Sequence, residues 1–205
     1  MPVRIDVWSD YVCPFCYLEL PVLDRLQKEL GDQVSVRWRA FELRPEPVPT
    51  LDPDAPYLHR VWGQSVYPMA EARGMMLRLP PVQPRSRKAH EAAAFARAVG
   101  RFEAMNAALF RAFFAEGRDI GDPDELVAIG RSTGLDAEAL RSALAEGCFT
   151  EEVLVEEAEA RRLGVDGVPA MVLAPEGEGR EVGRGLLVQG AQPYERVRDV
   201  AVQLL

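Results

Sequence analysis

The sequence predicts an α/β fold that is interrupted by an all-helical segment. Two observations carry this prediction. Strand patterns, in which apolar and polar residues alternate, occur near both ends of the 205-residue chain and are separated there by helix patterns. Between residues 57 and 148 no segment has a strand pattern, and the apolar residues recur at helical spacing. One α/β domain that carries a helical insertion accounts for both observations.

The start of the chain predicts a strand, a helix and a second strand. Apolar and polar side chains alternate over residues 3–8 and again over residues 34–41. Between them, the leucines from Leu20 to Leu30 recur at near-helical spacing, and Gly31 is a stop signal for that helix. This order of elements is a βαβ unit.

A proline-rich stretch and a series of helix signals mark the predicted insertion. Five prolines lie between residues 45 and 56, which favours a domain boundary there. Helix starts such as Asp122-Pro123 follow, with an acidic N-cap and proline at the first helical position. We therefore expect residues 1–56 and 150–205 to form one discontinuous domain and residues 57–149 to form the helical insertion.

The last part of the chain again alternates helices and strands. Residues 150–163 predict a helix, and we expect its glutamates, from Glu151 to Glu159, to form a solvated outer face. The elements that follow complete the α/β domain. They are a strand at residues 170–173, a turn at Gly177, Gly179 and Gly183, a strand at residues 185–190 and a helix at residues 193–204.

Composition and charge exclude several classes of partner. The formal net charge is -8, so the chain should repel nucleic acid and acidic membrane surfaces. No uninterrupted apolar run is long enough to span a bilayer. Asp6 and Asp10 interrupt the N-terminal residues before the apolar core of a signal peptide is formed, so we expect a cytoplasmic protein.

The chain has three cysteines, and two of them are close together in Cys13-Pro14-Phe15-Cys16. A tetrahedral zinc site needs four ligands, whereas the chain offers one close cysteine pair and two histidines. A structural disulfide across so short a loop would constrain the unfolded chain little. We therefore favour thiol–disulfide chemistry, and we expect no metal and no tightly bound cofactor. The third cysteine, Cys148, is expected to be a buried, inert thiol.

The position of the pair fits redox chemistry. It follows a strand and opens a helix, so Cys13 should lie at a first helical turn, where unpaired N–H groups and the helix dipole favour a thiolate. Pro14 suits such a turn because its missing N–H is not needed there. Cys16 follows one turn later, close enough to attack a mixed disulfide at Cys13. We therefore predict that Cys13 is the nucleophile and Cys16 the resolving thiol.

Four segments resemble the DsbA-like branch of the thioredoxin superfamily, in particular its FrnE-like and 2-hydroxychromene-2-carboxylate-isomerase-like proteins. The segments are DYVCPFCY at residues 10–17, FELRP at 41–45, GVDGVPA at 164–170 and QGAQP at 189–193. Together they span most of the chain. The resemblance implies a thioredoxin-like fold with an inserted all-helical domain.

The resemblance also implies that Val168-Pro169 is a cis peptide that faces the cysteine pair. The Val168 backbone would then be free to pair with an extended substrate segment. Asp10 is a candidate proton relay to Cys16, or else a cap of local N–H groups. His90 is a candidate for a substrate contact, or else a packing residue.

Phe15 distinguishes this pair from that of the periplasmic DsbA enzymes, which have Pro-His between the cysteines. Because a phenyl ring cannot donate a hydrogen bond or a positive charge to the Cys13 thiolate, we expect a reduction potential between about −120 mV and about −270 mV, the DsbA and thioredoxin values. Isomerase and kappa-class glutathione transferase relatives usually carry serine in place of the nucleophilic cysteine. The presence of both Cys13 and Cys16 therefore favours dithiol redox chemistry.

These observations predict a cytoplasmic thiol–disulfide oxidoreductase or isomerase. Its substrates are expected to be disulfide- or thiol-containing proteins or small molecules, with glutathione as a candidate redox partner. We expect a monomer or a homodimer, and neither nucleic acid nor membrane as a partner. Two alternatives stay open. One is a glutathione-dependent isomerase or transferase that acts on a small aromatic substrate, and the other is a non-catalytic peptide-binding module on the same fold.

Overall fold

The computed structural model describes residues 1–176 and 185–205, so the predicted turn at Gly177, Gly179 and Gly183 lies outside the described residues. The chain divides into a sheet unit, Met1–Leu43 with Glu156–Leu205, and a helical unit, Arg44–Val155. The domain limits that the sequence suggested, near residues 57 and 149, stay a prediction.

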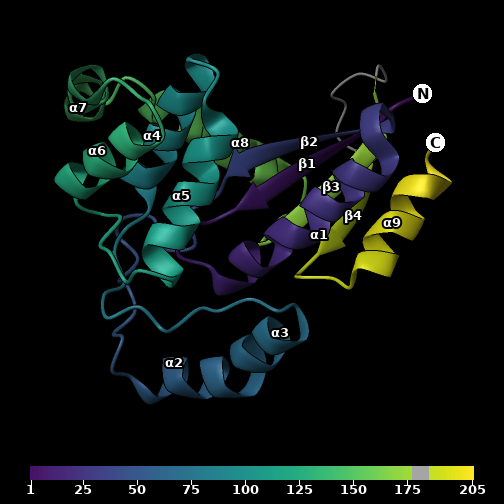
Figure 1. The fold of residues 1–205 in the computed structure, drawn as a ribbon, viewed down its shortest axis with the longest axis horizontal. Helices are drawn as coiled ribbons and strands as arrows, with labels where there is room; N and C mark the ends of the chain where they lie inside the picture. The colour runs from purple at the N-terminus through teal and green to yellow at the C-terminus, as the bar shows by residue number, and fades with distance from the viewer. Residues whose placement is uncertain (177–184) are drawn as a thin grey trace. The chain divides into compact units, whose positions relative to one another are not determined.

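A four-stranded sheet forms the centre of the sheet unit, with strand order β2-β1-β3-β4 (Figure 1). β1 (Val3–Ser9) pairs in parallel with β2 (Val34–Ala40), and α1 (Pro14–Leu30) connects them. β3 (Ala170–Pro175) is antiparallel to both β1 and β4 (Leu186–Gln189). The predicted βαβ unit and both late strands are therefore confirmed, and the fold is α/β.

One face of the sheet is apolar and packs against α1 and α9 (Tyr194–Gln203), which Figure 1 shows in front of the strands. Side chains two positions apart on a strand point to the same face, so the alternation over residues 3–8 places three apolar residues of β1 there. The buried cluster includes Val3, Ile5 and Val7 of β1, Leu23 and Leu26 of α1, and Val197 and Ala201 of α9.

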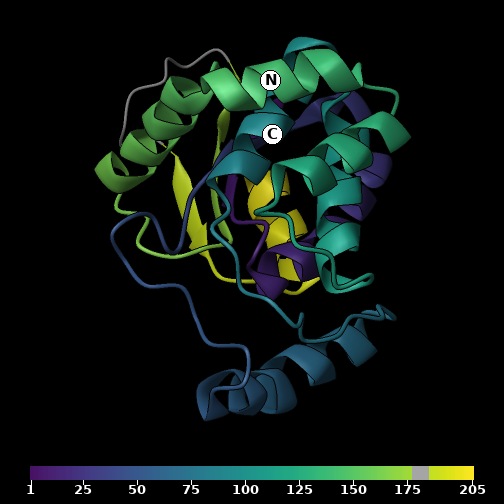
Figure 2. The ribbon, with the colours of Figure 1, turned by 90° about the vertical axis from the view of Figure 1, so that its left-hand side faces the viewer.

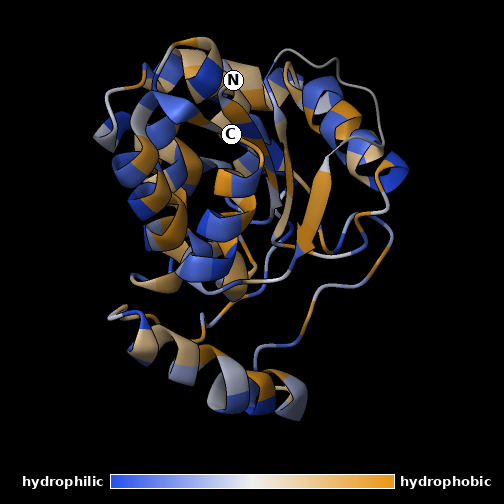
Figure 3. Cartoon of the chain, turned by 90° about the vertical axis from the view of Figure 1, so that its right-hand side faces the viewer, coloured by the Kyte–Doolittle hydropathy of each residue, from blue (hydrophilic) through white to orange (hydrophobic). Residues whose placement is uncertain are grey.

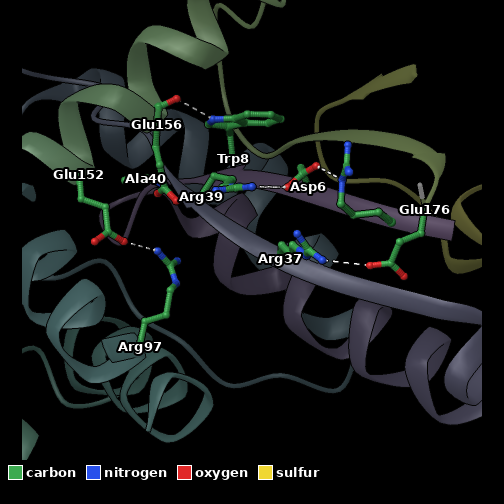
Figure 4. A network of polar contacts seen from close by, with 10 residues as sticks. Asp6, Trp8, Arg37, Arg39, Ala40, Arg97, Glu152, Glu156 and Glu176 are labelled. Carbon is green, nitrogen blue, oxygen red and sulfur yellow. Dashed lines mark hydrogen bonds and ion pairs between the residues drawn. The ribbon is translucent and has the colours of Figure 1, made fainter. Parts of the chain in front are cut away.

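The other face of the sheet carries buried charges that bind α8 (Thr150–Arg162), and Figure 2 shows α8 and α9 on opposite sides of the strands. Arg39 of β2 lies between two carboxylates, 2.9 Å from Asp6 and 3.0 Å from Glu156 (Figure 4). The indole Nε1 of Trp8 donates to the carbonyl oxygen of Glu156 at 2.9 Å. α8 is therefore held by these polar contacts and by a small apolar cluster that joins Trp8 to its Ala160, whereas the main apolar cluster lies between the sheet, α1 and α9.

The expectation of a solvated acidic face on α8 is wrong for two of its glutamates. Glu156 is 5% exposed and Glu157 is 1% exposed. Their carboxylates accept backbone N–H groups at the end of β2 and just after it, from Ala40 at 2.7 Å and from Glu42 at 3.2 Å. The two side chains are buried because they supply acceptors along a sheet edge that has no neighbouring strand.

β4 forms the opposite edge of the sheet and is apolar, as the orange strand of Figure 3 shows. Leu186 and Leu187 are 42% and 41% exposed, while Val188 is buried against the core. This edge therefore presents apolar side chains to solvent within the described residues.

The helical unit contains helices and no strand over residues 44–155, all of which the structure describes. Asp122 caps its helix by accepting the N–H of Asp124 at 2.9 Å, as the sequence predicts. The helices are α2 (Pro56–Val61), which continues through a π-helical turn (Trp62–Val66) into α3 (Tyr67–Ala72), then α4 (Arg87–Ala98), α5 (Phe102–Phe114), α6 (Pro123–Ser132), α7 (Ala137–Glu146) and the first residues of α8.

Two kinds of feature do not occur in the described part of the chain. No helix there has both the length and the apolar composition that crossing a membrane requires. Nor do three or more His, Cys, Asp or Glu side chains gather there in a way that would hold a metal ion.

Candidate active site

Both cysteines of the close pair lie in the turn that starts α1, directly after β1. Cys13 is the residue before the helix and Pro14 is its first residue, as the sequence predicts. The N–H of Cys13 donates to the carbonyl of Asp10 at 3.0 Å, and the carbonyl of Cys13 accepts the N–H of Cys16 at 3.1 Å. The two thiols are therefore held in one helical turn.

The Cys13 side chain faces the loop that precedes β3. Its Sγ donates to the carbonyl oxygen of Val168 at 3.4 Å. The Val168–Pro169 peptide is cis, as the family resemblance implies. Cys13 is 4% exposed, so its side chain is nearly buried. The fold thus joins residues that are more than 150 positions apart in the sequence.

Cys16 is fully buried, at 0% exposure. Burial raises the pKa of the Cys16 thiol well above its ordinary value, and a hydrogen bond with Cys13 and the charge of Cys13 raise it further. The carboxylate charge of Asp10 also raises this pKa, although a backbone hydrogen bond from Asp10 lowers it. Cys16 therefore holds its proton at neutral pH. Both cysteines are free thiols.

Asp10 is fully buried and organises the turn before Cys13. One carboxylate oxygen accepts the N–H of Val12 at 3.3 Å. The other accepts the N–H of Leu43 at 2.7 Å, from the chain that leaves β2. The bond from Val12 is a local capping contact of the kind that the sequence suggested as one of two roles for Asp10, whereas the bond from Leu43 joins a distant segment. The other role, as a proton relay, stays a prediction.

A second buried carboxylate lies beside the pair and was missed by sequence reasoning. Glu19 is on α1, three residues after Cys16, and is 0% exposed. Its oxygens accept the backbone N–H of Gln192 at 3.3 and 3.5 Å. The spacing carried a signal, because Glu19 precedes Leu23 by four residues and so shares a face of the predicted helix with that leucine.

Phe15 and His90, which the sequence analysis also proposed for the site, lie in different units of the chain. Phe15 is half-buried beside Cys16 in the same turn. His90 lies on α4 in the helical unit, where its side chain is buried, and it is not among the residues that the sheet unit brings together. A substrate contact by His90 stays a prediction.

Cys148 corrects the sequence analysis, because the structure shows it exposed rather than buried. It lies in the short connection between α7 and α8, with Sγ 3.8 Å from a carboxylate oxygen of Glu146. The adjacent Phe149 takes the packing position instead, with its ring centroid 6.0 Å from that of Phe95. Because Phe149 packs against Phe95, the smaller Cys148 side chain beside it is exposed.

The site has the parts of a thioredoxin-type centre, and comparison with known proteins agrees. The model of the DSBA-like thioredoxin domain family matches residues 4–201. The chain belongs to this family. Over 147 residues it is 40% identical to the uncharacterized protein YwbO of Bacillus subtilis (strain 168), a match that covers 70% of this chain and 72% of that protein.

One solved structure supports the same family, and a second supports the fold. A probable DsbA oxidoreductase from Streptomyces coelicolor is 30% identical, with a TM-score of 0.79 over 98% of this chain and 89% of that one. The cytosolic disulfide reductase DsbM from Pseudomonas aeruginosa, also solved with GSH, is 22% identical, with a TM-score of 0.71 over 98% of this chain and 100% of that one. The DsbM likeness shows the fold alone. The thioredoxin-like fold of this DSBA-like chain is confirmed, and its family is one of oxidoreductases.

Proposed function

We propose that this DSBA-like chain is a thiol–disulfide oxidoreductase or isomerase in which Cys13 is the nucleophile and Cys16 the resolving thiol. The observation that carries the proposal is the contrast between two thiols of one helical turn. Cys13 lies at the helix start beside the Val168 carbonyl, whereas Cys16 is fully buried with a raised pKa. A substrate therefore meets Cys13 first, and Cys16 reaches only the sulfur of Cys13.

The reaction is a transfer of two electrons between disulfides. The Cys13 thiolate attacks one sulfur of a substrate disulfide, a Cys13–substrate bond forms, and the other substrate sulfur leaves as a thiolate that takes up a proton. Cys16 then loses its proton and attacks the Cys13 sulfur, which releases the second substrate thiolate. The substrate is reduced and the cysteine pair is oxidised. Two glutathione thiols restore the dithiol and become oxidised glutathione, and the oxidative direction is the reverse.

Asp10 is the proposed proton relay for the resolving step. Cys16 must lose its proton in this step, although burial strongly favours the protonated thiol. The Asp10 carboxylate is buried with it, and its charge acts on the thiol. A carboxylate that disfavours the Cys16 thiolate also offers a nearby place for its proton. The bonds from Val12 and Leu43 would hold Asp10 in place for that transfer.

Val168 and Pro169 are proposed to shape the substrate groove, with Phe15 as an apolar wall. The Val168 carbonyl accepts a hydrogen bond from Cys13 in the free protein, so an extended substrate segment that pairs there would lie next to the attacking sulfur. The substrates are proposed to be disulfide- or thiol-containing proteins or small molecules in the cytoplasm. Support comes from the DsbM fold, which belongs to a cytosolic reductase that was also solved with GSH. We propose a monomer or homodimer.

Glutathione-dependent reduction of a peptide disulfide tests this function. We expect turnover by the wild-type protein, loss of turnover with Cys13→Ser, and an accumulated Cys13–substrate disulfide with Cys16→Ser. Glutathione consumption that does not depend on Cys16 would instead indicate the isomerase or transferase alternative. Absence of thiol turnover, together with full peptide binding by the double serine variant, would indicate a binding module.

A further inference from the structure

Glu19 is a buried carboxylate that the proposed reaction does not use. It lies on the face of α1 that also buries Cys16, Leu23 and Leu26, and its side chain is 0% exposed. Burial of a carboxylate is unfavourable unless hydrogen bonds compensate for the lost water. An apolar side chain would pack on this face without that penalty. The carboxylate is therefore best explained by the backbone that it binds.

That backbone is the connection between β4 and α9. Both oxygens of Glu19 lie within hydrogen-bonding distance of the Gln192 N–H, at 3.3 and 3.5 Å. The Gln192 side chain closes the same connection by donating to the carbonyl of Gln189 at 2.7 Å. Glu19 thus fixes the segment Gly190–Pro193 to the helix that starts with the cysteine pair.

The same connection binds the cis-proline loop from its other side. The N–H of Gly190 donates to the carbonyl of Pro169 at 2.8 Å, with Gly190 at a φ of 75°, a conformation that favours glycine. The side chain of Gln189 donates to Asp166 at 3.2 Å. A continuous series of hydrogen bonds therefore runs from α1, through the Gly190–Pro193 segment, to the loop that faces Cys13.

We propose that Glu19 is a positioning residue for thiol–disulfide exchange, which holds the cis-proline loop in register with Cys13 through the Gly190–Pro193 segment. The inference rests on the proposed function. It separates two properties of the site. The reactivity of Cys13 depends on the start of α1, whereas the placement of an extended substrate depends on Val168, Pro169 and the segment behind them.

The test compares a substrate that needs the groove with a reagent that does not. Glu19→Leu replaces the acceptor with an apolar side chain of similar size, whereas Glu19→Gln keeps an acceptor oxygen. We expect Glu19→Leu to raise the KM for a peptide disulfide by roughly tenfold, since small misplacements of a substrate have large kinetic effects. The rate of Cys13 alkylation by iodoacetamide should stay within about twofold of wild type, because that reagent does not use the groove. Glu19→Gln should have a KM closer to that of wild type than Glu19→Leu has, because it keeps an acceptor oxygen.

A second pair of variants tests the same bond from its donor. Gln192→Pro removes the N–H, at a position whose extended backbone is already favoured by Pro193. Gln192→Ala keeps the N–H and loses only the side-chain amide. We expect the larger rise in KM for Gln192→Pro, because Gln192→Ala loses only the side-chain bond to Gln189 and keeps the N–H that Glu19 accepts. If Glu19→Leu does not fold, this pair of variants still tests whether the bond between Glu19 and the Gln192 N–H is needed for substrate placement.

Three results would overturn the inference. The first is a wild-type KM in both Glu19→Leu and Gln192→Pro. The second is an equal rise in KM in Glu19→Gln and Glu19→Leu. The third is an equal rise in KM in the two Gln192 variants. Failure of the proposed function is distinct, because it shows in the wild-type protein as no reversible Cys13–Cys16 disulfide and no turnover. In that case both proposals fail together.

Discussion

The two cysteine-bearing turns of the chain differ in what surrounds the thiol. Cys13 and Cys16, before and within the first turn of α1, are 4% and 0% exposed and lie with Asp10 and the Val168 carbonyl. Cys148, just before α8, is exposed and lies near a carboxylate of Glu146. Both turns lead into a helix, so the helix start does not distinguish them. The difference is the second thiol, together with the loop that faces the first.

The largest difference between the turns is expected in catalysis. Cys13→Ser should lower disulfide turnover by on the order of a thousandfold or more, because serine cannot form the mixed disulfide. Cys148→Ser should leave turnover within about twofold of wild type, since Cys148 has no resolving partner. Steady-state reduction of a peptide disulfide measures both. Equal loss in the two variants would remove the distinction between the turns.

The next difference separates the two thiols of the first turn. Cys16→Ser should stop resolution but leave the attack by Cys13 intact, so turnover should fall by roughly a hundredfold or more while a mixed disulfide accumulates. Mass spectrometry of the acid-quenched protein, in a Cys148→Ser background, should find one substrate bonded at Cys13. Accumulation of the adduct in Cys13→Ser, with Cys16 intact, would reverse the proposed roles.

A smaller effect is expected from the carboxylates beside each turn. Asp10→Asn leaves a single acceptor oxygen for the N–H groups of Val12 and Leu43, so we expect a loss of about 1–3 kcal/mol in the free energy of unfolding. The matched change near Cys148, Glu146→Gln, lies on the surface and should alter stability by less than about 0.5 kcal/mol. Urea unfolding of the reduced proteins gives both values. Equal stability of the two variants would mean that Asp10 does not hold its turn.

The smallest predicted effect is a pH dependence of stability from Cys16. Its pKa is raised in the folded state by burial, so the unfolded chain releases this proton first as the pH rises. Stability from this group is complete below the unfolded pKa of about 8.5 and declines above it, by up to about 1.4 kcal/mol per pH unit. Cys16→Ala should remove that part of the alkaline loss. An identical alkaline slope in the reduced wild-type and Cys16→Ala proteins would contradict the raised pKa.

Local sequence patterns were enough to predict the strands and the helix that hold the cysteine pair. The parallel pair of β1 and β2, the helix start at Pro14 and the closeness of Cys13 to Cys16 follow from spacing and helix-capping chemistry within a few residues. The approach of Val168 to Cys13 could be expected only from the family resemblance, because the two residues are brought together by the antiparallel pairing of β3 with β1.

The contacts that decide whether some polar and sulfur-containing side chains are buried or exposed could not be predicted from the sequence, since they involve distant partners. The sequence predicts a solvated face for Glu156 and Glu157, yet their oxygens accept hydrogen bonds from the backbone at the end of β2. Glu19 is buried because a connection from the far end of the chain donates to it. Cys148 is exposed because Phe149 packs in its place. In each case the deciding contact comes from outside the local pattern.

The reduction potential of the Cys13–Cys16 pair tests the central claim most directly. The Cys148→Ser protein is equilibrated with glutathione buffers of graded potential, the free thiols are trapped by alkylation, and the fraction of protein with both thiols blocked is measured. The account predicts one reversible two-electron transition between about −120 mV and about −270 mV. Absence of a reversible Cys13–Cys16 disulfide at every potential tested would contradict it.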